Sequence, residues 1–216
     1  MSLSVDDVIR KRNIQQLLHF TTSNGLVGIM RSEQLLAHSE LPRNKQLSHI
    51  VQINCPDRSR DRDWHSFVNL SIDRVNASFF SIARDKWHIA KDVYWCVLAF
   101  DPAIMRHDGV HFATTNNAYV ETVKRSTGGE GLEALFSESV QVYPNRKAFR
   151  NSATPCNYTT CAQAEVLYPR AVSIEHLRAI YVPSEEIYHE VDAQINFFES
   201  SFLENFNIVI DPGQFK

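Results

Sequence analysis

Helical and strand-like periods alternate along the first part of the chain. Residues 4–16 open on Ser4 followed by two acids, which is typical of a capped helix start. The stretch 16–21 predicts a short strand, and apolar positions at helical spacing after Ser23 or Asn24 predict a second helix. The expected order is helix, strand, helix.

A long polar segment follows at residues 39–64. It has no apolar period and contains the alternating Asp and Arg run 57–63. We expect a loop, and loops this long in a compact domain are usually functional or mobile. Beyond it, the pattern predicts a strand at 67–72, a helix at 77–89 and a nearly continuous apolar central strand at 93–100.

The second half of the chain continues this mixture. Residues 125–162, which are polar and dotted with aromatics, are expected to form a long loop with a glycine-rich turn at 128–131. A single α+β domain over residues 1–216 is predicted, because no repeat or linker divides the chain. The remaining expected elements are strands at 110–113, 164–168, 179–182 and 207–210, a short helical stretch with Ile174 and Leu177, and a helix at 184–202.

Composition supports a folded domain. The 216 residues are 44% hydrophobic and include thirteen Phe, seven Tyr and three Trp, enough for a sizeable core and too aromatic for a disordered chain. The formal net charge of −3 provides no overall attraction for nucleic acid. Any contact with nucleic acid must therefore come from a local basic region.

Cysteine spacing and the N-terminal segment indicate the cellular compartment in which the protein is expected. Cys55, Cys96, Cys156 and Cys161 form no C-x-x-C pair, so neither a disulfide framework nor a metal site is expected. The N-terminal segment is charged, and no apolar run approaches the ~18 residues that a membrane span requires. We expect a cytoplasmic protein with reduced thiols and no membrane contact.

Two residues stand where catalytic groups could act. His19 lies at the edge of a predicted strand beside the hydroxyl of Thr21, and the pattern alone favours a half-buried histidine with satisfied hydrogen bonds. Glu165 lies where the long loop enters a strand. A carboxylate there could stabilise positive charge on a bound sugar, but the pattern alone favours an ordinary solvent-facing strand residue.

Arginines recur in the polar loop. Arg58, Arg60 and Arg62 alternate with acids, which favours a solvated, self-neutralising loop, although one guanidinium could clamp a pyrophosphate. The glycines at 128–131 lack the preceding strand and the spacing of a nucleotide-binding fingerprint, and they indicate a turn.

A second basic region combines cations and aromatic rings. Such a patch suits single-stranded nucleic acid, because cations meet phosphates while rings stack on bases. A plain basic loop is equally compatible with this composition. The residues are Arg146, Lys147 and Arg150, interleaved with Tyr143, Phe149 and Tyr158.

Several stretches, taken in order, resemble the DarT family of toxin ADP-ribosyltransferases. No stretch is specific alone, and their order and spacing along nearly the whole chain carry the resemblance. It implies an ADP-ribosyltransferase-like α+β fold with central mixed or antiparallel sheets flanked by helices, and transfer of ADP-ribose from NAD+ onto bases of single-stranded DNA. The matching stretches are Leu-His-Phe-Thr at 18–21, then 25–30, 34–38, 67–72 and 110–115, Gln-Ala-Glu-Val-Leu-Tyr at 163–168, and 180–186.

The resemblance also implies roles for particular residues. Glu165 would be the catalytic carboxylate, stabilising an oxocarbenium-like state as nicotinamide leaves, with Arg60 as a second catalytic residue. Gln163 would help to select the acceptor base. The implied NAD+ contacts are His19, Thr21, Gly25, Leu26, Arg58 and Ser71, and the other implied substrate contacts are Arg146, Lys147, Arg150 and Tyr158.

The chain also departs from the family pattern. Leu70 and Ser71 stand where better-known members carry tyrosine, and Thr115-Asn116-Asn117 replaces an acidic-histidine turn. A shorter loop between Arg62 and Phe67 leaves the choice of arginine open. These departures leave the acceptor base open between thymine and guanine.

The resemblance implies a biological setting as well. The chain would act as a monomer and as the toxin of a toxin–antitoxin pair, whose partner, a macrodomain-like or similar hydrolase, removes ADP-ribose. Two alternatives remain open. One is an ADP-ribosyltransferase that acts on RNA or protein, and the other is a non-catalytic nucleic-acid-binding module.

Overall fold

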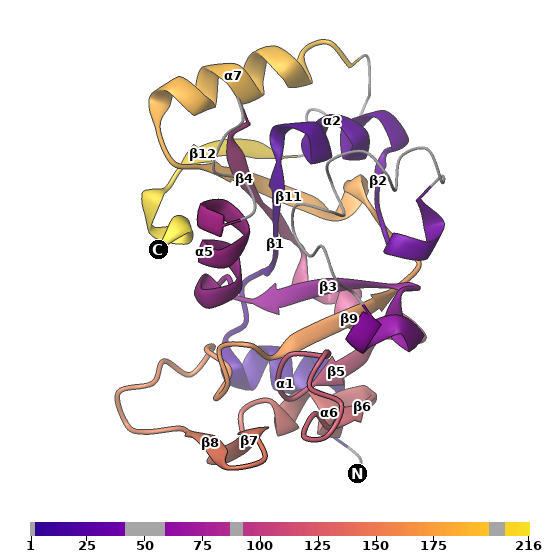
Figure 1. Ribbon diagram of the computed structural model, residues 1–216, viewed down its shortest axis with the longest axis vertical. Helices are drawn as coiled ribbons and strands as arrows, with labels where there is room; N and C mark the ends of the chain where they lie inside the picture. Colours follow the sequence, from indigo (N-terminus) through magenta and orange to yellow (C-terminus); the bar gives the residue numbers. More distant parts are fainter. Residues whose placement is uncertain (1–2, 42–58, 87–92, 199–205) are drawn as a thin grey trace.

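The computed structural model describes residues 3–41, 59–86, 93–198 and 206–216. One eight-stranded sheet runs through them in the order β12-β11-β4-β1-β3-β9-β5-β6, as Figure 1 shows. Neighbouring strands of this sheet are antiparallel, except that β11 and β12 are parallel. Its strands are β1 (Leu17–Thr22), β3 (Phe67–Ile72), β4 (Trp95–Phe100), β5 (His111–Ala113), β6 (Arg125–Ser126), β9 (Glu165–Pro169), β11 (Leu177–Val182) and β12 (Asn207–Ile210).

Two small sheets and five helices complete the described part of the chain. This confirms the predicted α+β class with a mixed sheet flanked by helices. The small sheets pair β2 (Gln34–Leu36) with β10 (Ala171–Ser173) and β7 (Ser139–Tyr143) with β8 (Arg146–Phe149). The helices are α1 (Val5–Arg12), α2 (Ser23–Ser32), α5 (Ala77–Lys86), α6 (Gly128–Ala134) and α7 (Glu185–Ile195). Within these ranges, no helix is both long enough and apolar enough to span a membrane.

Strand β4 forms the centre of one half of the sheet, as its apolar sequence predicts. Every residue of Trp95–Phe100 is buried. Helices α2 and α7, which contact each other, pack Leu26, Met30 and Val191 into the larger hydrophobic cluster. Helix α5 packs Phe80 and Ala83 into a separate cluster. Figure 1 shows α5 well apart from the α2 and α7 pair.

Helix α1 begins at the cap that the sequence predicts, and it ends at Arg12, before the end of the stretch 4–16. Ser4 and Asp7 form a capping box, each side chain accepting from the other residue's backbone N–H. Its C-cap is Asn13, which adopts a left-handed conformation with φ of 53°. After Ile14, whose N–H donates to the Ile9 oxygen, the backbone N–H groups of Gln15 and Gln16 both donate to the buried carboxylate of Asp73. The helix therefore ends before residue 16.

The sheet is joined across its middle by only two residue pairs. Strand β1 pairs with β4 over its whole length, Leu17–Thr22, but with β3 only at Leu17↔Ile72 and Leu18↔Ser71. Beyond Leu18, β1 and β3 separate. In Figure 1, β3 and β9 run crosswise to β1 and β4.

The structure corrects the loop predicted at 125–162. This segment contains β6, α6 and the β7–β8 hairpin, and the glycines at 128–131 begin a helix and do not form an isolated turn. Glycine is a poor helix former, so the sequence does not predict a helix at this place. Packing requires glycine here, because a Cβ on Gly129 would lie 2.2 Å from the carbonyl oxygen of Leu3. The hairpin buries Val140 and Val142 against Cys161.

Other predicted boundaries shift by a few residues. The helical stretch expected around Ile174 and Leu177 is a single 3-10 turn, Ile174–His176, because Leu177 already begins β11. Helix α7 ends at Ile195 with Asn196 as its C-cap, earlier than predicted. The predicted helix 77–89 is described as far as Lys86. Most of the predicted loop 39–64 lies outside the described residues, which there include only the 3-10 turns His38–Glu40 and Ser59–Trp64.

We predict that Gly129→Ala lowers the free energy of unfolding by about 1–3 kcal/mol, because the added methyl group meets backbone that cannot rotate away. Urea denaturation measures the change. Glu130→Ala, at an exposed position of the same helix, is the control and should stay within about 0.5 kcal/mol of the parent. Equal losses at both positions would contradict the close packing of α6 on the N-terminal segment.

Candidate functional site

The candidate catalytic carboxylate is fixed by a backbone hydrogen bond. Glu165 is the first residue of β9 and is half-buried. Its Oε2 accepts a hydrogen bond of 2.7 Å from the backbone N–H of Asn117. The preceding loop ends directly on this residue, so the predicted position at the junction of loop and strand is confirmed. A carboxylate held by a backbone donor is oriented before any ligand arrives.

Asn117 is in turn held by Arg125. Asn117 is almost fully buried. Arg125 donates to its side chain from Nε to Oδ1 at 2.5 Å and to its backbone oxygen from Nη2 at 2.8 Å. The Arg125 guanidinium also lies over the ring of Trp64, 4.8 Å from its centroid. Since Trp64 ends the 3-10 turn that carries Arg60, a chain of contacts connects this turn to Glu165.

His19 lies where β1 leaves β3. Its Nδ1 is 3.1 Å from the backbone oxygen of Asn69, and because a carbonyl can only accept, Nδ1 carries the proton. The side chain is half-buried and hydrogen-bonded, as the sequence pattern favours. The imidazole thus links β1 to β3 at a point where these two strands no longer exchange backbone hydrogen bonds.

The start of α2 packs tightly on β1. Thr22 caps the helix, its hydroxyl accepting from the N–H of Gly25. A Cβ on Gly25 would come within 2.0 Å of the Thr21 hydroxyl oxygen, so glycine permits this close approach. Thr21 is buried, and the Leu26 side chain belongs to the hydrophobic core. Only the backbone of Leu26 remains as a potential ligand contact.

Ser71 lies close to Glu165 in strand register. Leu70 pairs with Val166, and one step further along the two antiparallel strands brings Ser71 level with Glu165. Among the predicted arginines, Arg58 lies outside the described residues. Arg60 belongs to the 3-10 turn Ser59–Trp64, and only the backbone of Arg60 is described.

Gln163 is set among tyrosines two residues before Glu165. The Tyr119 and Tyr143 hydroxyls are 2.8 Å apart. Burial, reinforced by Tyr143, raises the pKa of Tyr119 to about 12, while a hydrogen bond from Gln163 acts in the opposite direction. The Gln163 Oε1 is buried and accepts no hydrogen bond within the described residues. It could accept one from a bound N–H group.

The basic patch divides into exposed and engaged cations. Arg146 and Lys147 are exposed on β8. Arg150 instead donates to the backbone oxygens of Tyr158 and Pro155, both at 2.6 Å, and of Cys156 at 3.1 Å. Burial lowers the pKa of Arg150. Its side chain therefore fixes the loop 150–164 from within.

Three residues of the site, Arg74, Asn117 and Arg125, are assigned no role in it from the sequence, although Asn117 is noted there as part of a turn that departs from the family pattern. Arg74 follows β3 and donates from Nη2 to the backbone oxygen of Thr159 at 2.8 Å. Asn117 falls in the run Thr-Thr-Asn-Asn, and asparagine commonly accepts hydrogen bonds in turns. Nothing local in the sequence distinguishes Arg125, since its importance depends on the pairing of β6 with β5.

The fold of this chain is similar to those of solved DarTG and DarT structures. Thermosipho africanus DarTG in complex with ADP-ribose matches with a TM-score of 0.64 at 17% identity, over 93% of this chain and 51% of that chain. This chain therefore spans about half of DarTG. Thermus sp. 2.9 DarT in complex with NAD+ matches with a TM-score of 0.61 at 18% identity, over 94% of this chain and 98% of that chain.

Sequence comparison identifies the family. The family model described as DarT, ssDNA thymidine ADP-ribosyltransferase, matches residues 18–215. The chain belongs to the DarT family, which confirms the resemblance. A third structure, Thermus sp. 2.9 DarT in complex with ADP-ribosylated ssDNA, matches with a TM-score of 0.59 at 16% identity, over 94% of this chain and 97% of that chain. No curated protein matches the chain.

We predict that Asn117→Ala lowers the free energy of unfolding by about 1–3 kcal/mol, because the half-buried Arg125 loses the acceptor of its Nε. The backbone N–H that binds Glu165 is retained in this variant. Thermal and urea unfolding measure the effect, with the exposed Asn145→Ala as control. An Asn117→Ala protein as stable as the parent would show that Arg125 does not depend on this side chain.

Proposed function

We propose that this chain transfers ADP-ribose from NAD+ onto a base of single-stranded DNA. The observation that carries the proposal is the Glu165 carboxylate, oriented by the Asn117 N–H at the end of the loop that would receive the substrate. Membership of the DarT family supports this reaction. The structures of Thermus sp. 2.9 DarT with NAD+ and with ADP-ribosylated ssDNA support the same pair of substrates.

In the proposed reaction, the bond between ribose C1′ and the nicotinamide nitrogen breaks, and its electron pair leaves with nicotinamide. Positive charge develops on the ribose, and the Glu165 carboxylate stabilises it. A base nitrogen then bonds to C1′ and loses its proton to the medium. The buried Gln163 Oε1 would accept a hydrogen bond from the base and so orient it.

The NAD+ site is proposed at the opening between β1 and β3. His19, Thr21 and the backbone at Gly25 and Leu26 would contribute from β1 and the start of α2. Ser71, which pairs with Leu18 where the opening begins, would contribute from β3. Arg60 would supply a cation to the pyrophosphate, with Arg58 as the alternative. For DNA, Arg146 and Lys147 are exposed, whereas Arg150 would act by holding the loop 150–164 in shape.

We predict that Glu165→Gln reduces transfer by about 10²–10³-fold, because the amide keeps the size of the carboxylate and loses its charge. The assay follows labelled NAD+ onto oligonucleotides that each lack one base. An oligonucleotide without the acceptor base should stay unlabelled, which distinguishes thymine from guanine. Glu138→Gln, at an exposed position, is the matched control and should retain full activity.

The alternatives have distinct outcomes in this assay. Labelling of RNA or protein without labelling of DNA would overturn the DNA assignment. If no substrate is labelled and NAD+ does not bind, the assignment as an enzyme fails, and the non-catalytic nucleic-acid-binding module is the alternative that remains.

We also propose that the chain is a monomeric toxin opposed by an antitoxin with a macrodomain-like or similar hydrolase fold. The likeness to a DarTG structure in complex with ADP-ribose supports a paired system. Expression of the wild-type chain should arrest growth, and expression of Glu165→Gln should not. Co-expression of the neighbouring reading frame should restore growth and remove ADP-ribose from the modified DNA. Persistent modification in its presence would exclude that product as the antitoxin.

A further inference from the structure

A pocket of about 460 Å³ lies between the end of β3, the start of α5, the loop 150–164 and the residues around Pro212–Phe215. This volume falls within the range of about 300–1,000 Å³ that is usual for small-ligand sites. Tyr158 and Ala162 line it from the loop, and Ala162 is three residues before Glu165. The pocket therefore adjoins the segment that ends at the candidate catalytic residue.

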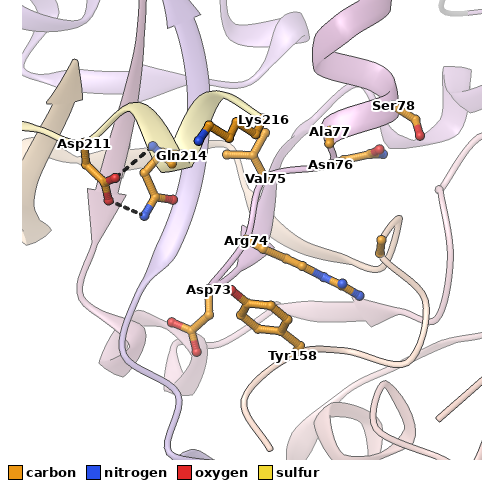
Figure 2. Close-up of a pocket in the computed structure, with 12 residues that line it drawn as sticks. Asp73, Arg74, Val75, Asn76, Ala77, Ser78, Tyr158, Asp211, Gln214 and Lys216 are labelled. Atoms are coloured by element: carbon orange, nitrogen blue, oxygen red, sulfur yellow. Dashed lines mark hydrogen bonds between the residues drawn. The ribbon is translucent and has the colours of Figure 1, made fainter. Parts of the chain in front are cut away.

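Arg74 provides the pocket with hydrogen-bond donors that the described protein does not satisfy. Figure 2 shows its side chain beside Tyr158, whose ring centroid lies 4.9 Å from the guanidinium carbon. Nη2 donates to the Thr159 oxygen, but Nε is buried and has no acceptor within the described residues. Burial lowers the pKa of Arg74, which indicates a partly desolvated cation.

The two carboxylates of the pocket accept hydrogen bonds from groups other than Arg74. Asp73 accepts from the backbone N–H groups of Gln15 and Gln16 and from Asn157 Nδ2, at 2.9–3.0 Å in the shortest contact of each. Asp211 accepts from the Gly213 N–H at 2.9 Å and from Gln214 Nε2 at 3.0 Å, as Figure 2 shows. Neither forms an ion pair with Arg74, among the contacts of the described residues.

These surroundings favour a neutral ligand with acceptor atoms over a phosphate. The carboxylates of Asp73 and Asp211 balance the cations of Arg74 and the exposed Lys216, so the pocket has no net positive charge to attract a phosphate. The walls combine the apolar side chains of Val75 and Ala77 with the amide of Asn76. A nucleobase has this character, since it presents ring carbons together with carbonyl and ring-nitrogen acceptors.

We propose that this pocket binds a base of the single-stranded substrate that flanks the modified base, and that Arg74 donates to the acceptor edge of this flanking base. The inference rests on the proposed function for the identity of the substrate. Tyr158 positions the guanidinium by stacking on it. The pocket then sets a sequence preference at one position beside the target. A base with two adjacent acceptors, as guanine has, suits an arginine fork best.

The test compares the parent with Arg74→Met, which keeps the length of the side chain and removes its donors. Fluorescence anisotropy measures binding to oligonucleotides in which one flanking position at a time is varied through all four bases, without NAD+. The parent should discriminate among bases by about tenfold at one position, and Arg74→Met should reduce this to less than about twofold. Arg10→Met, which removes an exposed arginine on α1, should preserve the preference.

Arg74→Lys is a second variant, which separates loss of the guanidinium from misfolding. It keeps the charge and loses the fork, so the base preference should fall as in Arg74→Met while binding to weakly preferred sequences stays near the parent value. Melting temperatures establish that each variant is folded. Tyr158→Leu, which removes the stacked ring, should weaken the same preference at the same position.

Three outcomes overturn the inference. An equal loss for all flanking bases in Arg74→Met would indicate a phosphate contact. A raised KM for NAD+ with an unchanged base preference would assign the pocket to NAD+. An unchanged preference and unchanged affinities would show that the pocket binds no substrate.

The binding assay also separates the inference from the proposed function. If the parent fails to modify DNA yet binds with an Arg74-dependent preference, the proposed reaction is wrong and the pocket assignment stands. If DNA is modified and the preference ignores Arg74, only the pocket assignment fails.

Discussion

The buried carboxylate of Asp73 is the contact on which the arrangement of the site depends. It accepts from the backbone N–H groups of Gln15 and Gln16 at the entrance to β1, and from the Asn157 side chain in the loop 150–164. Asp73 itself directly follows β3 in a left-handed conformation, with φ of 53°. Burial raises its pKa, and these hydrogen bonds act in the opposite direction. One side chain thus joins the beginning of β1, the end of β3 and the loop before Glu165.

Such a clamp is needed because the sheet is weakly joined at this point. Only two residue pairs connect β1 with β3, and His19 follows directly where the pairing stops. The loop 150–164 has no helix or strand of its own, so its carbonyl groups need other partners. Arg150 binds three of them and Arg74 a fourth. A loop fixed in this way can present Gln163 and Glu165 in one geometry at little conformational cost.

The sequence predicts the parts of this structure that local patterns encode. The buried run of β4, the capped start of α1 and the place of Glu165 at the junction of loop and strand all follow from residue order. The start of helix α6 does not, because Gly129 is required by the close approach of Leu3, which is distant in sequence. The roles of Arg125 and Arg74 cannot be predicted from the sequence, because they too depend on contacts that only the fold creates. Their partners, Asn117 and Thr159, are brought to them only by strand pairing and by the folded loop.

The distribution of cations bears on how an acidic chain could hold DNA. Affinity that comes from phosphate contacts requires arginines and lysines free to meet the backbone. In the loop region, Arg150 is occupied by carbonyl groups and Arg125 by Asn117, which leaves Arg146 and Lys147 exposed on β8. Among the described residues of this region, few cations are then free for phosphates, and more of the binding energy there would come from bases held in pockets and against rings. Base contacts carry sequence information and phosphate contacts do not. For a chain with a net charge of −3, the proposed function therefore favours selective modification of a few sequences over coating of single strands.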